Sequence, residues 1–275
     1  MHPELVNLGF LHLKTYGVCI AVGFLLAWKI IEKLSGREDL SNLLVSLMVA
    51  GIIGGRAAYV IENWSREFSA NPLSVIRIDQ GGLVFYGGLI LSIIVFFAYC
   101  IMKKERPAAL ADLLASVVPL AHAFGRIGCF FFGCCYGKES RSAFAVCFPM
   151  HSPAWYEQVV AGKIPPVASC SLPVMPAQLF EAGSLLILFA VTCTLYRVLY
   201  RRGAAEARSG IVSGVYLMGY AVVRFFLEYL RGDPRAQVGP FSIAQTISFG
   251  ILLLGIAFAT AGLVRPGKSN GRVGG

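Results

Sequence analysis

An arginine and three thiols fall within one glycine-rich stretch, residues 125–137, directly after the apolar run 108–124. Arg126 has a glycine immediately before it and another two residues after it. Placing a charge in hydrocarbon costs at least ~2.5–3.5 kcal/mol on insertion scales, so an arginine in a membrane-length segment indicates a functional site. A planar guanidinium also suits a phosphate better than an ammonium does. The stretch therefore predicts recognition of an anionic headgroup.

Other ionisable residues interrupt apolar runs elsewhere in the chain. Arg224 and Glu228 are four residues apart and so share a helix face. Arg56 and Glu181 lie in two further runs. All are placed toward one end of their runs, which predicts a single polar cavity at the outer leaflet. Two simpler explanations stay open: Arg56 could snorkel to the headgroups, and Arg224 with Glu228 could form a structural ion pair.

Residues 80–88 contain two Gly-Gly pairs on either side of a segment that includes Tyr86. Glycine lets backbone come close to a ligand or to a neighbouring helix, so Tyr86 is expected to point inward. The alternative is that Gly87 and Gly88 are small residues that serve tight helix packing.

Composition places the chain among polytopic membrane proteins. Of its 275 residues, 56% are hydrophobic and 14% charged, against about 25% charged in soluble domains. The formal charge of +9 comes from short basic clusters between apolar runs, which is typical of topology signals and anionic-lipid contacts. This pattern excludes a nucleic-acid partner.

Seven apolar runs are long enough to cross a bilayer as helices, so the predicted fold is all-α. These spans are 16–34, 43–61, 82–102, 108–131, 176–200, 211–230 and 244–264. They form one domain, 1–264, followed by a cytoplasmic tail, 265–275, that is expected to be disordered.

Basic residues are concentrated in alternate loops, which by the positive-inside rule are cytoplasmic. They are Lys33, Arg37, Lys103, Lys104, Arg106, Arg201, Arg202, Arg208, Arg265, Lys268 and Arg272. The N-terminus is therefore predicted outside and the C-terminus inside. The loops 62–80, 138–175 and 231–243 are then extracytoplasmic, and 138–175 is large enough for a small subdomain inserted between spans.

Several motifs occur together in the order seen in prolipoprotein diacylglyceryl transferases, and the chain resembles that family from about Tyr16 to Ala259. They are Tyr16-Gly17, Gly54-Gly55-Arg56 with Tyr59, the glycine-flanked stretch 81–88, Gly125-Arg126-Ile127-Gly128 with Gly133 and Gly137, Pro176-x-Gln178-Leu179-x-Glu181, and Arg224-Phe225-x-x-Glu228.

The resemblance implies a multi-pass enzyme of the bacterial inner membrane, monomeric, without metal or organic cofactor. Its partners would be membrane lipid, phosphatidylglycerol and the lipobox segment of a preprolipoprotein. The enzyme would transfer the diacylglyceryl group to the lipobox cysteine as a thioether and release glycerol phosphate. The implied catalytic residues are Arg126, Arg224 and Tyr86. The implied substrate-binding residues are Arg126, Tyr16, Arg56, Gly87, Gly88, Gly137, Gln178, Glu181, Tyr220 and Glu228.

Three positions depart from the family's usual pattern. Tyr86 stands where some members have a histidine proposed as the base, Cys129 where asparagine is frequent, and Met175 where histidine commonly precedes the proline. Tyrosine has a reference pKa of about 10 and is a poor base, so the general base stays unassigned.

Disulfides are plausible among four thiols near the largest loop, Cys134, Cys135, Cys147 and Cys170, on an oxidising face of the membrane. Free structural thiols are the alternative. A metal or redox site is disfavoured because the chain has no Cys-x-x-Cys pair there and His151 is the only histidine nearby.

Two other functions compete with transfer. A lipid or anion transporter would also use intramembrane arginines, but the sequence shows no inverted repeat. A paralogue that binds lipid or lipoprotein precursors without transfer is the other alternative, and Tyr86 and Cys129 keep it open.

Overall fold

The computed structural model describes residues 4–7, 12–69, 71–77, 81–201, 209–232 and 237–264. The chain divides into two compact units, each considered by itself. Unit 1 contains Met1–Leu34 and Ala111–Gly275, and unit 2 contains Ser35–Leu110.

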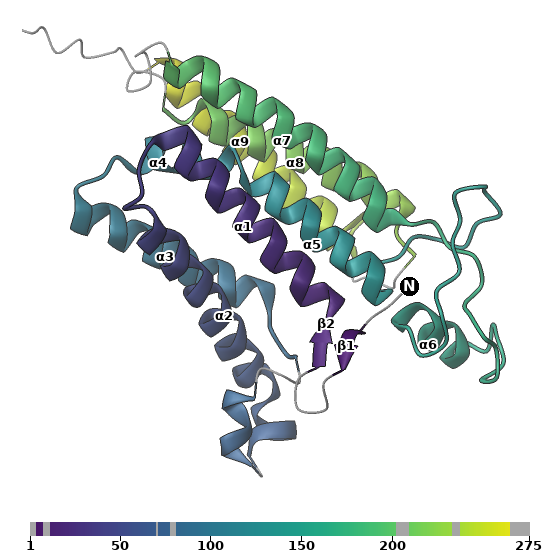
Figure 1. Cartoon of the computed structure of the whole chain (residues 1–275). Helices are drawn as coiled ribbons and strands as arrows, with labels where there is room; N and C mark the ends of the chain where they lie inside the picture. The colour runs from purple at the N-terminus through teal and green to yellow at the C-terminus, as the bar shows by residue number, and fades with distance from the viewer. Residues whose placement is uncertain are drawn as a thin grey trace, which may run out of the picture. The chain divides into compact units, whose positions relative to one another are not determined.

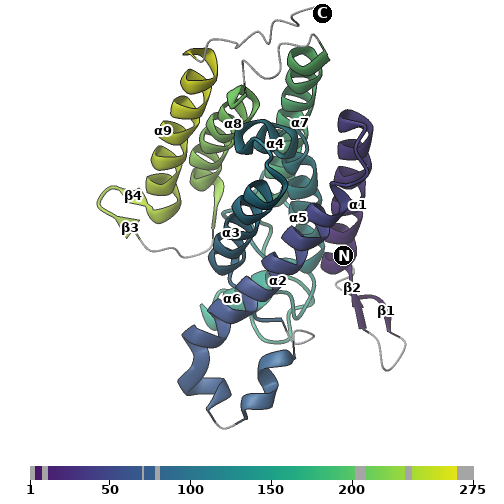
Figure 2. The ribbon, with the colours of Figure 1, turned by 90° about the vertical axis from the view of Figure 1, so that its left-hand side faces the viewer.

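Unit 1 is a bundle of long helices, visible side by side in Figure 1 and, turned by 90°, in Figure 2. Helix α5 packs against α7, α7 against α8, and α8 against α9. Its helices are α1 (Thr15–Ser35), α4 (Pro107–Ala115), whose first residues belong to unit 2, α5 (Val118–Phe132), α6 (Pro153–Val160), α7 (Ala177–Arg201), α8 (Ile211–Leu227), the 3-10 helix η4 (Glu228–Leu230) and α9 (Ile243–Val264).

Small residues let the helices of unit 1 approach closely. A Cβ added to Gly214 of α8 would lie 2.7 Å from the carbonyl oxygen of Gly255 in α9, and one added to Gly255 would lie 2.9 Å from that of Gly214. Van der Waals packing of this kind drives helix association in lipid, where the hydrophobic effect between helices is weak.

Unit 2 is a helix pair with a structured connection. Helix α2 (Ser41–Asn63) continues into the π-helix η1 (Trp64–Phe68), then the 3-10 helix η2 (Pro72–Ile76) and α3 (Phe85–Lys103). Gly88 of α3 faces Gly51 of α2 so closely that an added Cβ would lie 2.6 Å from the Gly51 carbonyl oxygen. Gly87 meets Gly54 and Ala58 in the same way. These contacts favour the helix-packing explanation of Gly87 and Gly88.

The loop between α5 and α7 forms a small folded element with helix α6 and its own core. Tyr136, Phe148, Ala154 and Val174 are buried together there. Backbone bridges close the loop, including Val146 with Val174. Short antiparallel pairs, β1 (Glu4–Asn7) with β2 (His12–Lys14) and β3 (Gln237–Val238) with β4 (Phe241–Ser242), complete the described structure.

Five helices of the described residues are long and apolar enough to cross a membrane, and six if α4 and α5 count as one span bent by 42°. The bend lies at a break next to Pro119, which cannot donate a backbone hydrogen bond. Helix α1 covers the first predicted span but is not among the six. The chain is thus an all-helical polytopic membrane protein, and seven spans with an external N-terminus stay predictions. Arg202, Arg208 and the tail 265–275 lie outside the described residues.

A buried carboxylate fixes the start of α8. Asp112 of α4 is fully buried and accepts hydrogen bonds from Gly210 N at 2.8 Å, Ser213 N at 2.8 Å and Ser213 Oγ at 2.7 Å. It also accepts a bond from the Tyr200 hydroxyl at 3.2 Å. The first N–H groups of a helix have no partner within the helix, and a negative charge there is favourable. Asp112 thereby ties α4 to α8.

Replacing this carboxylate should destabilise the bundle strongly. Asp112→Ala leaves several buried donors without an acceptor, each costing about 1–3 kcal/mol. We expect the free energy of unfolding in detergent to fall by at least ~3 kcal/mol, as measured by denaturant titration followed by tryptophan fluorescence. Glu139→Ala is the control, because it breaks an exposed ion pair with Lys163 (2.7 Å); its effect should stay below about 1 kcal/mol. Equal losses in both variants would contradict the role given to Asp112.

Candidate functional site

Helix α5 presents Arg126 between two glycines that have different environments. Around Gly125 a Cβ would meet nothing within 4 Å, so space is open on that side of Arg126. At Gly128 a Cβ would lie 3.0 Å from the ring of Tyr16, which lets α1 approach α5 closely. The helix ends at Phe132 because Gly133 adopts a left-handed conformation, with a φ of 83°.

Arg126 lies between a carboxylate and an imidazole. Its Nε is 3.0 Å from Oε1 of Glu181 in α7 and donates a hydrogen bond to Nε2 of His122 at 3.2 Å. The side chains of Arg126 and Glu181 are 19% and 2% exposed. Because the Nε–H is directed to His122, Glu181 Oε1 is paired by charge alone and has no hydrogen-bond donor among the described residues.

A second buried ion pair lies along α8. Arg224 Nη2 is 2.8 Å from Glu228 Oε2, and the two side chains are 11% and 7% exposed. The other terminal nitrogen of Arg224, Nη1, is buried and has no hydrogen-bond partner in the part of the chain that is described. The ion pair that the structural explanation requires is therefore present. One donor of the Arg224 guanidinium, Nη1, has no partner among the described residues.

Tyr220 connects the two pairs. It packs against the apolar seam formed by Ala123, Ala182 and Leu185 between α5 and α7. Its ring centroid lies 5.4 Å from that of His122, and both side chains are within electrostatic range of Arg126 and Arg224. The two guanidinium groups thus converge on one buried region of unit 1.

The unsatisfied atoms of this region define what it can bind. An unpaired buried polar group costs about 1–3 kcal/mol, so such groups in native structures need an explanation. An anion would satisfy Arg224 Nη1, and a hydroxyl would satisfy Glu181 Oε1. A phosphate that carries a hydroxylated substituent offers both.

The other predicted residues of unit 1 surround this region. Gln178 is fully buried and donates from Nε2 to the carbonyl oxygen of Cys134 at 2.7 Å. Gly137 N donates to Met175 O at 2.8 Å, and a Cβ at Gly137 would lie 2.7 Å from Leu230 O. Tyr16 is 41% exposed beside α5. Gln178 and Gly137 therefore hold the chain that follows α5.

The Arg56 side chain of unit 2 donates its hydrogen bonds to backbone carbonyl oxygens. Its guanidinium donates to Ser74 O at 2.8 Å, Val75 O at 2.8 Å and Gly81 O at 2.9 Å, with a further bond to Gly82 O. The rings of Tyr59 and Phe68 lie 5.4 Å and 5.3 Å from it. Arg56 thus anchors the connection between α2 and α3 instead of snorkelling.

Tyr86 is the predicted catalytic residue of unit 2. It lies in the first turn of α3 and is 55% exposed, and the inward orientation expected for it stays a prediction.

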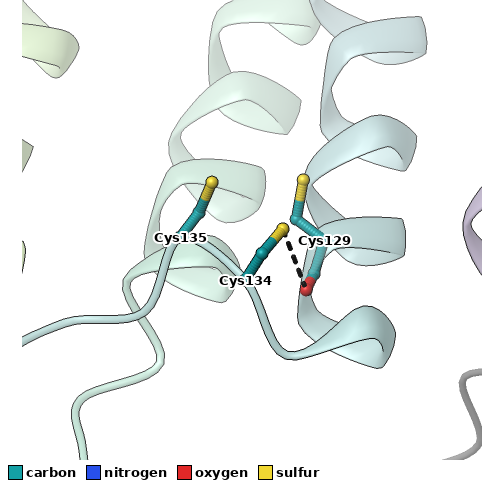
Figure 3. Close-up of side chains that lie close together, drawn as sticks. All are labelled: Cys129, Cys134 and Cys135. Atoms are coloured by element: carbon teal, nitrogen blue, oxygen red, sulfur yellow. Dashed lines mark hydrogen bonds between the residues drawn. The ribbon is translucent and has the colours of Figure 1, made fainter. Parts of the chain in front are cut away.

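The thiols form a cluster that sequence spacing does not suggest. All eight cysteines are free, so no bridge joins Cys134, Cys135, Cys147 or Cys170 in the structure. The sulfur atoms of Cys129, Cys134 and Cys135 all lie within 4.8 Å of one another (Figure 3). The turn at Gly133 returns the chain to the end of α5, which brings together thiols that have no Cys-x-x-Cys spacing.

Two functional side chains were not predicted from the sequence. His122 is one helical turn before Arg126, and this four-residue spacing within an apolar run could have indicated it. Asp112 is the lone carboxylate of its apolar run, which was also a usable signal.

Comparisons with known proteins agree with these motifs. The family model described as prolipoprotein diacylglyceryl transferase matches residues 3–261. The chain is 30% identical to phosphatidylglycerol–prolipoprotein diacylglyceryl transferase 2 of Clostridium perfringens over 95% of both chains. It is 31% identical to the enzyme named phosphatidylglycerol–prolipoprotein diacylglyceryl transferase in Clostridium tetani, over 93% of this chain and 96% of that one. A Geobacter sulfurreducens protein with the same name is 29% identical over 94% of each.

The anchoring role of Arg56 can be tested by proteolysis. Arg56→Lys keeps the charge but cannot satisfy several carbonyls at once, and bonds from charged donors contribute about 1.5–3 kcal/mol each. We expect trypsin to cleave after Arg66 and Arg77 at least about tenfold faster, because cleavage follows the population of the open loop. Mass spectrometry of the fragments measures the rates.

Arg37→Lys is the matched control, since it is the same substitution at an ion-paired arginine near the start of α2. Unchanged cleavage in Arg56→Lys would mean that Arg56 does not hold the loop.

Proposed function

Since the chain belongs to the prolipoprotein diacylglyceryl transferase family, we propose that Arg126 and Arg224 hold the phosphate of phosphatidylglycerol during transfer. The chain is a transferase that moves the diacylglyceryl group of phosphatidylglycerol to the cysteine thiol of a prolipoprotein. This reaction is the first step of lipoprotein maturation. The observation that carries the assignment of the site is the buried, unsatisfied Nη1 of Arg224 in the region that also contains Arg126.

The chemistry requires stabilisation of a leaving anion. A bond forms between the cysteine sulfur and the terminal glyceride carbon, while the bond from that carbon to the phosphate oxygen breaks. Negative charge grows on the phosphate as glycerol phosphate leaves, and the thiol proton balances it. Preorganised donors aimed at that charge lower the barrier, and two guanidinium forks supply them. No oxidation state changes, so the reaction needs no redox cofactor.

The carboxylates and His122 position the arginines. Glu181 and Glu228 keep each guanidinium charged and in place inside the bundle, where an uncompensated charge would cost several kcal/mol. His122 accepts the Nε–H of Arg126, which leaves the terminal nitrogens of that fork to face the phosphate. Glu181 Oε1 accepts a hydrogen bond from a hydroxyl of the glycerol headgroup. Such positioning is effective because orientation alone can supply several kcal/mol of the barrier.

The remaining site residues have supporting roles. Tyr220 and Tyr16 border the headgroup, while Gln178 and Gly137 fix the segment beyond α5. Arg56, Gly87 and Gly88 act on the substrate through the shape of unit 2, which they maintain. Tyr86 positions the substrate with its exposed ring and does not serve as the base.

The topology that fits this chemistry has seven spans, with α1 as the first and α4 with α5 as one bent span. The N-terminus is outside the bacterial inner membrane, so the loop that carries α6 faces the side on which secreted prolipoproteins emerge. The chain acts as a monomer.

Arg126→Ala should reduce transfer at least about tenfold, because a hydrogen bond to a charged group contributes ~1.5–3 kcal/mol. Purified protein, phosphatidylglycerol vesicles and a lipobox peptide are mixed, and mass spectrometry detects the diacylglyceryl thioether. Arg126→Lys should recover only part of the rate, since an ammonium lacks the fork. Lys163→Ala, in the exposed pair with Glu139, is the control and should transfer normally. Normal transfer by Arg126→Ala would contradict the phosphate assignment.

The role given to Tyr86 leads to a different expectation. Tyr86→Phe keeps the ring and removes only the hydroxyl, so kcat/KM should fall less than about tenfold. A tenfold fall corresponds to a loss of about 1.4 kcal/mol of transition-state stabilisation. The pH profile of transfer should keep its shape, because no titrating base has been lost. A profile that changes shape, together with a loss of more than about 100-fold, would show that Tyr86 takes the thiol proton.

A further inference from the structure

The thiol cluster at the end of α5 points to a metal site. Cys129 is in the last turn of α5 and is 8% exposed, while Cys134 and Cys135 follow the turn and are partly buried. The three sulfur atoms lie within 4.8 Å of one another and face a common space (Figure 3). Ligands at the usual Zn–S distance of about 2.3 Å are about 3.8 Å apart around a tetrahedral ion.

The segment that carries the thiols is held in this arrangement by backbone bonds. Gly133 N and Cys134 N both donate to Cys129 O, at 2.9 Å and 3.2 Å. The Cys134 carbonyl oxygen accepts from Gln178 Nε2, and Tyr136 O accepts from Gly232 N at 3.2 Å. The thiols are thus preorganised by groups outside the cluster, which is what a metal site requires.

Cys135 adopts a backbone conformation that favours thiol convergence. Its φ is 63°, a left-handed value that costs a non-glycine residue about 1–3 kcal/mol. Strain of this size persists where the surroundings impose it, and it is concentrated at functional sites. Here it turns the side chain of Cys135 back toward Cys129 and Cys134.

The charges around the cluster suit an ion bound by thiolates. Three thiolates and one divalent cation carry a net charge of −1. Arg126 is three residues before Cys129 on the same face of α5, and Arg231 lies beside Cys135. Soft thiolate donors select ions such as Zn²⁺ over Mg²⁺ or Ca²⁺.

We propose that Cys129, Cys134 and Cys135 bind one thiophilic divalent d¹⁰ cation, Zn²⁺ in the cell, through three thiolates. Binding releases the three S–H protons to solvent and changes no oxidation state. A disulfide would use only two of the three thiols, whereas one ion uses all of them. The fourth coordination position is open to water, as in zinc sites with three protein ligands.

Cd²⁺ is the probe for this site, because Cd–thiolate bonds absorb in the ultraviolet by charge transfer. The full-length reduced protein in detergent is titrated with CdCl₂, with Zn²⁺ as competitor. We expect one Cd²⁺ per chain, displaced by Zn²⁺, and slower alkylation of the three thiols when Cd²⁺ is bound. The exposed Cys147 should react at the same rate with and without the ion.

Cys135→Ser, at a partly exposed position, should weaken Cd²⁺ binding more than about 100-fold. Substituting a residue that only hydrogen-bonds to a metal ligand typically weakens metal binding about 10–100-fold, so a larger loss indicates direct ligation. Its circular dichroism spectrum and melting temperature in the absence of metal show whether it is folded. The double variant Cys147→Ser/Cys170→Ser removes two thiols that lie outside the cluster and should bind Cd²⁺ as the unmodified protein does. Equal binding by Cys135→Ser, or less than one ion per chain, would overturn the proposal. So would a disulfide between any two of the three cysteines in protein isolated without reductant.

Discussion

Burying guanidinium charge among apolar helices is the constraint on which the rest of unit 1 depends. A charge removed from water costs several kcal/mol even after the protein relaxes, so the arginines require carboxylates close by. Glu181 of α7 and Glu228, the first residue of η4, meet this requirement. The Arg126–Glu181 pair requires α5 and α7 to pack in one register, because a shift of one helical turn, about 5.4 Å, would separate charge from countercharge. Arg224 and Glu228 are four residues apart in one segment and stay paired whatever that register is. Site and fold are therefore specified by the same contacts.

Arg56 and Arg224 differ in how completely their donors are satisfied. Arg56 gives its donors to backbone carbonyls and so rigidifies a loop. Arg224 keeps a buried nitrogen that has no partner among the described residues. A saturated guanidinium is structural, whereas an unsaturated one in a buried region has a hydrogen bond to offer an anion. This difference separates binding residues from structural ones better than the presence of arginine in an apolar run does.

Glycine has two distinct functions near the site. At Gly128, and between Gly87 and Gly54, the missing side chain lets helices touch, which is a matter of packing. At Gly133 the missing side chain permits a left-handed turn that ends α5 and returns the following cysteines to it. The second function creates the thiol cluster beside Arg126. The same turn brings the Cys134 carbonyl oxygen to the Gln178 side chain, whose Nε2 donates a hydrogen bond to it.

The sequence by itself determined the membrane class, the helical runs and one ion pair, Arg224 with Glu228. The length of an apolar run and its charge content indicate whether a segment lies in lipid or in water. A spacing of four residues places two side chains on the same face of a helix. These are local properties, and the single outer-leaflet cavity expected for Arg56, Arg126, Glu181, Arg224 and Glu228 stays a prediction.

Only the tertiary structure decided how each side chain is used. The carbonyls around Arg56 and the donors around Asp112 come from segments distant in sequence, so no local pattern encodes them. The exposure of Tyr86 and the convergence of Cys129 with Cys134 and Cys135 likewise depend on where the chain turns. Sequence spacing measures distance along the chain, while hydrogen bonds and metal ligation depend on distance in space. That is why the membrane class and the helical runs could be predicted, while most partners of the polar side chains could not.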